Sequence, residues 1–408
     1  MGTLIFTTYR ACFMKKTLLL FTVPMLLNFS SCHSSSTEEN ATADKDSSVA
    51  TKENYPDWTL LPFNKTDSAN PILKPGDNTF LDPITHQVTG WEAKNVFNPA
   101  IAVRNDTVFM LYRAQDSIGK PTGTSRIGLA ASVDGIHFAR YPSPVLYPMN
   151  DAYKKWEWQG GCEDPRVVED SAGTYYMTYT AYDGKTARLL IATSTDLMHW
   201  TKHGSVFAKA YKGKYVDKWS KSGSIVSSYK DGKITAVKLN GKYWMYWGDL
   251  FIWAATSDNL IDWTPVEMKA GEKPPVALKG VAEKVPDLKI AVPTRDDKFD
   301  NDLVESGPPA MLTDKGILLL YNSRRMPPDG DTTLKEGTYT TGQVLLDKND
   351  PTKILNRLDH YFMKPEKDYE LTGEVNNVCF IEGLAQFHNQ YFLYYGTADS
   401  KIAVAIKK

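Results

Sequence analysis

The sequence predicts an all-β fold, a five-bladed β-propeller with its active site in the central channel, on three observations. An aromatic-rich apolar segment occurs five times, at Val108–Ala114, Tyr175–Ala181, Lys242–Gly248, Ile317–Ser323 and Tyr391–Thr397. The central residues of these segments are 67, 67, 75 and 74 positions apart. Helical periodicity is weak throughout. Short antiparallel strands repeated radially make a propeller, whereas two β-sandwiches would not explain so even a step.

Composition limits the class of protein. The chain has 408 residues with 47 Lys and Arg against 48 Asp and Glu, a formal net charge of −1. That balance argues against a nucleic-acid partner, for which a positive excess is expected. The hydrophobic fraction of 42% and the charged fraction of 23% are those of a globular protein.

The N-terminus has the pattern of a targeting segment. Residues 1–31 contain two lysines, an apolar run and a Ser-Ser exit, so they predict a signal peptide with Met14 as the true start. Cys32 follows as in a bacterial lipobox, which predicts its lipidation; plain cleavage and secretion is the alternative. Residues 32–55 would be a flexible tether and residues 56–408 the propeller. The predicted location is the outer membrane of a Gram-negative bacterium, on its periplasmic or outer face.

The body holds only two cysteines, Cys162 and Cys379. Both stand in apolar, strand-like segments, so two buried thiols are expected rather than a disulfide. The cysteines and the seven histidines show no metal-ligand spacing. We therefore expect neither a metal nor a cofactor.

Each predicted unit begins with polar residues, and the first strand of a blade lines the channel. Charged and amide side chains far apart in sequence should then meet near one axis, where their burial would be costly unless they served a ligand. The candidates are Asn98, Glu163, Asp164, Arg166, Lys221, Glu305 and Glu382, with Arg113, Asp249, Asn322 and Asp399 from the other ends of the channel-side hairpins.

Carboxylates in an aromatic-walled pocket suit glycoside cleavage, in which one protonates the leaving oxygen and another activates water. Asp164 is the candidate acid because Pro165 fixes its backbone and the charge of Glu163 is expected to raise its pKa. A turn-capping Asp-Pro is the alternative. Arg113 and Arg188 would grip hydroxyls or simply form structural ion pairs. One or two of five tryptophans are expected to stack on sugars, the others being core: Trp156, Trp158, Trp244, Trp247 and Trp253.

Ordered motifs then point to a family. The chain resembles glycoside hydrolase family 130 from about Phe97 to its end, through NPAIAV, LYRA, SRIGLAASVDGIHF, GGCEDPRVV, YYMTYTAY, LLIATSTDLMHW, ESGPPAML and YYGTADSKIAVA. The resemblance implies a five-bladed propeller that acts on β-mannosides with inversion, as a phosphorylase or as a β-1,2-mannosidase. It also implies that Asp164 is catalytic, and it carries sugar-gripping roles to Asn98, Arg113, Lys221 and Asp399.

The resemblance also bears on phosphate. The phosphorylases are expected to carry Tyr-His-Gly after the fourth-blade strand and His-Arg after the third. This chain has Tyr321-Asn322-Ser323 and Trp247-Gly248-Asp249 instead. Losing cations removes attraction for an anion. In the mannosidases two acids activate water; Glu305 matches one, and Asp249 stands where Glu is expected.

The favoured hypothesis is therefore an inverting, exo-acting β-mannosidase, with Asp164 as general acid and with Glu305 and Asp249 activating water. Its substrate would be a mannoside oligosaccharide, most readily β-1,2-linked. A phosphate-dependent β-mannoside phosphorylase and a non-catalytic sugar-binding propeller are the alternatives, and an arabinan or xylan hydrolase on a related propeller is more remote. Room for a water predicts that acid and base lie roughly 6.5–9.5 Å apart.

Overall fold

The computed structural model describes residues 55–120 and 122–408. The predicted signal peptide, Cys32 and all but the last residue of the predicted tether lie outside the described residues. Within them the fold is nearly all β, as the sequence predicts, with short helices only: α1 (Lys154–Glu157), α2 (Asp368–Leu371) and two 3₁₀ segments at Ala210–Gly213 and Gly280–Lys284. No described helix has the length and apolarity needed to cross a membrane.

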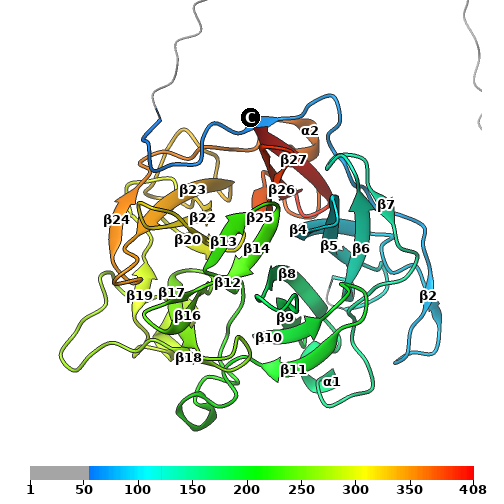
Figure 1. Cartoon of the computed structure of the whole chain (residues 1–408), viewed down its shortest axis with the longest axis horizontal. Helices are drawn as coiled ribbons and strands as arrows, with labels where there is room; N and C mark the ends of the chain where they lie inside the picture. Colours follow the sequence, from blue (N-terminus) through cyan, green and yellow to red (C-terminus); the bar gives the residue numbers. More distant parts are fainter. Residues whose placement is uncertain (1–54, 121) are drawn as a thin grey trace, which may run out of the picture. The chain divides into compact units, whose positions relative to one another are not determined.

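Most strands fall into five consecutive antiparallel groups, which Figure 1 shows arranged around a common centre. The first two groups are β4 (Asn95–Arg104), β5 (Thr107–Gln115), β6 (Ser125–Ser132) and β7 (Ala139–Arg140), then β8 (Gly161–Glu169), β9 (Tyr175–Tyr182), β10 (Ala187–Ser194) and β11 (Thr201–Ser205). The third is β12 (Ser224–Ile225), β16 (Lys242–Trp247), β17 (Ile252–Ser257) and β18 (Trp263–Pro265), flanked by β15 (Lys238–Leu239) and β19 (Ile290–Val292).

In the fourth group, two short strands pair with the same third strand. In the fifth group, the outermost strand comes from the start of the described chain. The fourth is β20 (Leu303–Ser306), β21 (Met311–Leu312), β22 (Ile317–Arg324), β23 (Tyr339–Leu346) and β24 (Ile354–Arg357). The fifth is β25 (Cys379–Phe387), β26 (Gln390–Thr397), β27 (Lys401–Lys407) and β1 (Asn64–Lys65). A separate small ribbon joins β2 (Phe80–Leu81) to β3 (Val88–Thr89).

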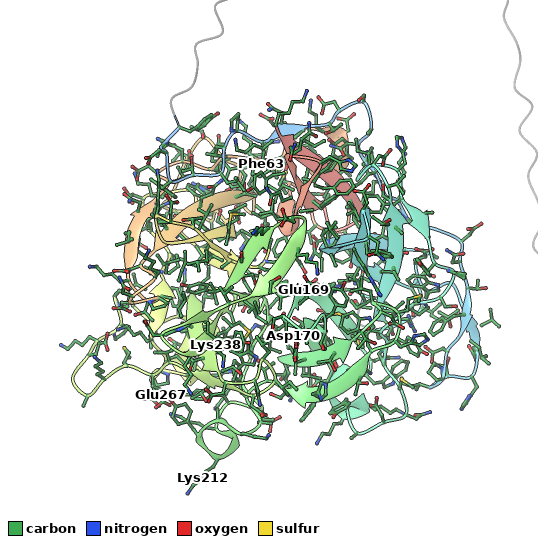
Figure 2. The ribbon with its side chains drawn as sticks, viewed as in Figure 1. Phe63, Glu169, Asp170, Lys212, Lys238 and Glu267 are labelled. Atoms are coloured by element: carbon green, nitrogen blue, oxygen red, sulfur yellow. The ribbon has the colours of Figure 1, made fainter. Side chains whose placement is uncertain are left out.

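The five recurring segments of the sequence form β5, β9, β16, β22 and β26, which pair with the first strand of each group, or with both short first strands in the fourth group. Side chains fill the space between the groups (Figure 2), in five buried clusters that each draw on two neighbouring groups. One of these clusters joins the last group to the first, through Tyr394 and Met110. This cyclic packing agrees with the propeller, although ring closure and the number of blades remain predictions.

A hairpin of β13 (Ser227–Lys230) and β14 (Lys233–Ala236) crosses the centre in Figure 1. It makes parallel bridges to β21, at Ser227–Met311, and to β8, at Thr235–Glu169. It thereby ties the second group to the fourth. The pattern of five similar units did not predict this insertion.

The two cysteines confirm the expectation of buried thiols. Cys162 and Cys379 are both fully buried and free. Burial raises the pKa of each thiol well above its usual value, so both stay protonated.

Candidate active site

A cavity of about 110 Å³ collects polar side chains from all five groups. Its polar wall contains six residues named from the sequence: Asn98, Arg113, Asp164, Lys221, Glu305 and Asp399. Its other wall is made by residues that the sequence did not single out: Tyr339, Val375, Val378 and Phe380. The expected convergence near one centre is therefore observed for these six.

Asp164 is the most heavily contacted carboxylate of the cavity, and it is buried. Asn98 Nδ2 donates to its Oδ1 at 2.9 Å, and Arg113 Nη1 donates to the same oxygen at 3.0 Å. Lys221 Nζ lies 3.7 Å from its other oxygen, Oδ2. Two hydrogen-bond donors from the first strand group and a cation that precedes the third group therefore hold the carboxylate in one place.

Glu305 lies on the other side of Lys221. Lys221 Nζ is 3.5 Å from Glu305 Oε1, which also accepts a hydrogen bond from Ser222 Oγ. Because Lys221 contacts both carboxylates, their two contacted oxygens are no further apart than the sum of its two distances. That upper limit admits the lower end of the roughly 6.5–9.5 Å separation of inverting glycosidases, and also the roughly 5–5.5 Å of retaining ones.

Local backbone irregularities aim these side chains at the cavity. Asn98 on β4 and Glu382 on β25 are extra residues in their strand pairings, and Asp164 with Pro165 forms a third bulge, on β8. Asn98 and Asp164 have positive φ values of 47° each, a conformation that Asn and Asp tolerate better than most residues. Bulges of this kind re-aim side chains next to active sites.

A glycine from the recurring YYGT segment makes room for Asn98. A Cβ added to Gly396 would lie 2.3 Å from Asn98 Oδ1. Any larger residue there would displace the amide that positions Asp164. The close approach of the Asn98 side chain, and not a turn, therefore requires glycine at this position of the motif.

Electrostatics correct one expectation. The charge of Glu163 was expected to raise the pKa of Asp164. Burial does raise it, but Arg113 and Lys221 outweigh burial and hold the pKa of Asp164 well below its usual value. Burial instead raises the pKa of Glu163 to about 7, against the pull of Arg113 at 2.7 Å. In the free site Glu163 therefore binds a proton more tightly than Asp164 does.

The remaining cavity acids also hold protons more tightly than usual. Burial raises the pKa of Asp399 to about 6, despite Arg113. Burial likewise raises the pKa of Glu305, despite Lys221 and with Asp249 adding repulsion. The same acids raise the pKa of Lys221, although burial opposes this, so the lysine stays charged.

Arg166 and Glu382, predicted to bind substrate, lie beneath the cavity wall. Both are buried, and neither is among the residues that line the cavity. Arg166 donates to the carbonyl oxygens of Gly307 at 2.8 Å and Ser306 at 2.6 Å, and lies 3.4 Å from Glu382 Oε1. The Arg166 guanidinium thus joins its own strand group, the second, to the fourth and the fifth.

Arg188 also lies outside the cavity lining. Its guanidinium contacts Asp183 at 2.7 Å and Asp217 at 3.2 Å, which is the structural ion pair considered as its alternative. Asp249 accepts a hydrogen bond from Trp219 Nε1 at 2.7 Å. It is near enough to raise the pKa values of Glu305 and Lys221, so it lies beside the cavity.

Asn322 serves the backbone of its neighbour. Its Nδ2 donates to the carbonyl oxygen of Ile381 at 2.9 Å, and its Oδ1 accepts from the Ile381 amide at 2.7 Å. The adjacent Ser323 hydroxyl bonds to Thr340. Both side chains next to Tyr321 therefore connect strands, and neither lines the cavity.

The tryptophans proposed as sugar platforms are not part of this cavity. None of the five lines it in the described structure. Trp247 and Trp253 are buried and pack against each other at 5.1 Å between ring centroids, so their reading as core is correct. The aromatic wall is made instead by Tyr339 and Phe380. Tyr339 lies on β23, and Phe380 is an apolar residue at the start of β25, so the search for polar residues at the start of each unit did not mark either.

Comparison with known proteins finds relatives that act on mannosides or are described as glycosidases. The glycoside hydrolase family 130 model, described as β-1,4-mannooligosaccharide phosphorylase, matches residues 64–408. A 1,2-β-oligomannan phosphorylase of Thermoanaerobacter sp. (strain X514) is 31% identical over 78% of this chain and 90% of its own. A putative glycosidase structure from Bacteroides thetaiotaomicron is 44% identical with a TM-score of 0.80, over 86% of this chain and 98% of its own.

One further solved structure bears on the reaction. It is 42% identical with a TM-score of 0.81, over 87% of this chain and 96% of its own. Its description reports that the GH130 family of mannoside phosphorylases contains glycoside hydrolases that target β-1,2 mannosidic linkages in Candida mannan.

Proposed function

The chain belongs to glycoside hydrolase family 130, and we propose that it is an inverting, exo-acting β-mannosidase that hydrolyses β-1,2-linked mannosides. The observation that carries the proposal is the placement of Asp164 and Glu305 on either side of Lys221. That arrangement provides an acid and a base for water attack on opposite faces of one sugar ring.

The charge around the cavity supports hydrolysis over phosphorolysis. Three cations stand against six acids: Arg113, Arg166 and Lys221 against Glu163, Asp164, Asp249, Glu305, Glu382 and Asp399. All three cations already contact carboxylates. An inorganic phosphate would have to compete with these carboxylates for each of the three cations.

Asn322 supports the same choice. The phosphorylases are expected to present a histidine at this position. Both polar atoms of Asn322 are used by the backbone of Ile381. The residue is therefore held by the backbone, and its neutral amide carries no positive charge to offer an anion.

The cavity suits attack at a chain end. Its volume of about 110 Å³ is small beside the roughly 300–1,000 Å³ of sites that enclose whole ligands. Apolar side chains, Val375, Val378 and Phe380, close one side. Only the terminal unit of an oligosaccharide would enter.

The mechanism follows from these positions. Asn98, Arg113 and Asp399 bind hydroxyls of the terminal mannose, and Asp164 delivers a proton toward the glycosidic oxygen. Glu305, with Asp249 beside it, removes a proton from the attacking water. Asp164 must hold that proton in the productive complex, so bound sugar must weaken its contacts with Arg113 and Lys221. Because Glu305 must be ionised and its pKa is raised, the reactive protonation state is a minor one in the free enzyme.

The test is incubation with β-1,2-mannobiose, with and without inorganic phosphate, followed by NMR of the first product anomer. We expect α-mannose at a rate that does not depend on phosphate. A rate that requires phosphate, with mannose 1-phosphate as product, would establish the phosphorylase named by the relatives. Binding without turnover in both conditions would establish the non-catalytic alternative.

We also propose that the five strand groups are the blades of a closed propeller, and that Cys32 carries a lipid that anchors the protein to the outer membrane. The cyclic packing of the core supports the first proposal, and the pattern of residues 14–32 supports the second. Metabolic labelling of the wild type and of Cys32→Ala with a lipid precursor tests the anchor.

A further inference from the structure

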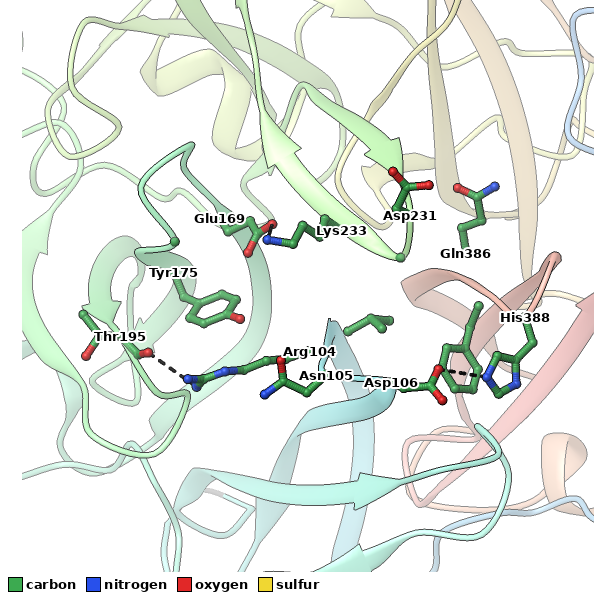
Figure 3. Close-up of a pocket in the computed structure, with 14 residues that line it drawn as sticks. Arg104, Asn105, Asp106, Glu169, Tyr175, Thr195, Asp231, Lys233, Gln386 and His388 are labelled. Atoms are coloured by element: carbon green, nitrogen blue, oxygen red, sulfur yellow. Dashed lines mark hydrogen bonds and ion pairs between the residues drawn. The ribbon is translucent and has the colours of Figure 1, made fainter.

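A second cavity, of about 370 Å³, opens between four hairpin turns (Figure 3). Its volume falls within the roughly 300–1,000 Å³ of small-molecule sites. Its rim is formed by the turns that follow β4, β8, β13 and β25, together with Tyr175 and Thr195.

The second cavity is remote from the active site. Asn98 and Arg104 both lie on β4, six residues apart, which corresponds to about 20 Å of extended strand. On β8, Asp164 of the first cavity and Glu169 of the second cavity are likewise separated along one strand, by five residues. Buried apolar side chains such as Ile101 occupy the stretch between them. The two cavities therefore lie at opposite ends of the same strands.

Interactions between groups connect the turns around this cavity. His388 Nε2 lies 2.9 Å from Asp106 Oδ1, which ties the fifth group to the first (Figure 3). Lys233 Nζ lies 3.5 Å from Glu169 Oε1, which ties the central hairpin to the second group.

One buried polar atom inside this rim has no partner within residues 55–120 and 122–408. The Oε1 atom of Gln386 is buried and has no hydrogen-bond partner among the described residues. Asp231, labelled opposite the Arg104–Asp106 turn in Figure 3, is exposed to solvent and forms no ion pair within the described part of the chain. A buried acceptor left without a donor costs free energy that a bound hydroxyl would recover.

We propose that this cavity is a second saccharide-binding site, which takes a neutral sugar and not an ion. Donors such as Arg104 and Lys233 alternate with acceptors such as Asp231 and Gln386, and hydroxyl groups both donate and accept. An anion would face Glu169, and a cation would face Arg104, so neither charge is favoured. The buried ring of Tyr175 gives one wall an apolar edge for the C–H face of a sugar.

The test measures how much saccharide each variant binds. Full-length chains carrying Asp164→Asn, to prevent turnover, are titrated calorimetrically with β-1,2-mannotetraose, cellotetraose and tetragalacturonate. Thr195→Trp would fill the cavity from an exposed loop position, and Thr264→Trp, on the exposed face of β18, is the matched control. We expect Thr195→Trp to bind one neutral saccharide fewer per chain than Thr264→Trp.

Gln386→Leu provides an independent variant of similar size. It should weaken that binding at least about tenfold without lowering the unfolding temperature, because the lost oxygen has no partner in the free protein. Equal saccharide binding by Thr195→Trp and Thr264→Trp would overturn the proposal, and so would preference for tetragalacturonate. The comparison between variants does not depend on whether the first cavity hydrolyses mannosides, so the two proposals fail separately.

Discussion

At the scale of the residue, the surroundings of Asp164 in the free site favour its ionised form, whereas the proposed reaction needs its protonated form. A general acid needs a proton, yet Arg113 and Lys221 favour the carboxylate. Burial instead raises the pKa values of the neighbouring acids Glu163 and Asp399. This reversal is a property of the assembled site, since the cations come from other strand groups.

Asp164→Asn should lower kcat by roughly 10²–10⁴-fold while leaving KM nearly unchanged, because the amide keeps the shape but carries no transferable proton. Steady-state hydrolysis of β-1,2-mannobiose measures both constants. Asp170→Asn, in the turn at the far end of the same hairpin, is the control and should keep the wild-type rate. A near-normal rate in Asp164→Asn would remove this residue from the mechanism.

Asp399→Asn tests the raised pKa of this buried acid. The folded pKa of about 6 exceeds the unfolded value of 3.8, so ionisation destabilises the folded state as the pH rises through that window. The variant should therefore gain stability relative to the wild type between about pH 4 and pH 7, on the order of 1–3 kcal/mol. Urea unfolding at both pH values measures this gain. A difference that is independent of pH would show that Asp399 has an ordinary pKa.

At the scale of the element, hydrogen bonds between side chains and backbone join one strand group to the next. Asn322 on β22 satisfies both the amide and the carbonyl of Ile381 on β25. Arg166 on β8 donates hydrogen bonds to the carbonyl oxygens of Ser306, the last residue of β20, and of Gly307. Polar side chains therefore supply hydrogen bonds to the innermost strands where bulges interrupt the backbone pairing between strands.

Asn322→Ala should lower the free energy of unfolding by about 1–3 kcal/mol, because two buried backbone groups lose their partners. Chemical denaturation measures the change. Asn356→Ala, on the exposed face of β24, is the matched control and should be nearly neutral. If Asn322→Ala were equally neutral, Asn322 would not be holding the two groups together.

At the scale of the whole molecule, the start of the described chain fastens its end. β1 pairs with β27, and the side chain of Asn70 bonds to both the amide and the carbonyl of Val404. Lys65 Nζ lies 2.7 Å from the fully buried Glu370. The last strand group is thus completed by residues from the opposite end of the sequence.

A chain shortened to begin at residue 76 should unfold at a lower temperature and aggregate, because it exposes the edge of β27 and leaves Glu370 unpaired. A chain beginning at residue 56 retains these contacts and is the control. Thermal unfolding with light scattering distinguishes them. Equal unfolding temperatures would show that β1 adds nothing to the fold.

Sequence alone determined the all-β class, the five strand repeats, the buried thiols and six of the side chains around the active-site cavity. These features are local or periodic: strand alternation, turn chemistry and polar residues at the start of each unit all leave a trace in the order of residues. The family itself followed from ordered motifs for the same reason.

Only the tertiary structure decided which polar residues face the cavity. Arg166 and Arg188 look like ligand-binding residues in sequence, but one joins backbones and the other pairs with surface acids. The aromatic wall of Tyr339 and Phe380, the lowered pKa of Asp164 and the second cavity arise where separate groups meet. Electrostatic fields and cavity walls depend on distances between residues remote in the chain, and a linear pattern does not contain those distances.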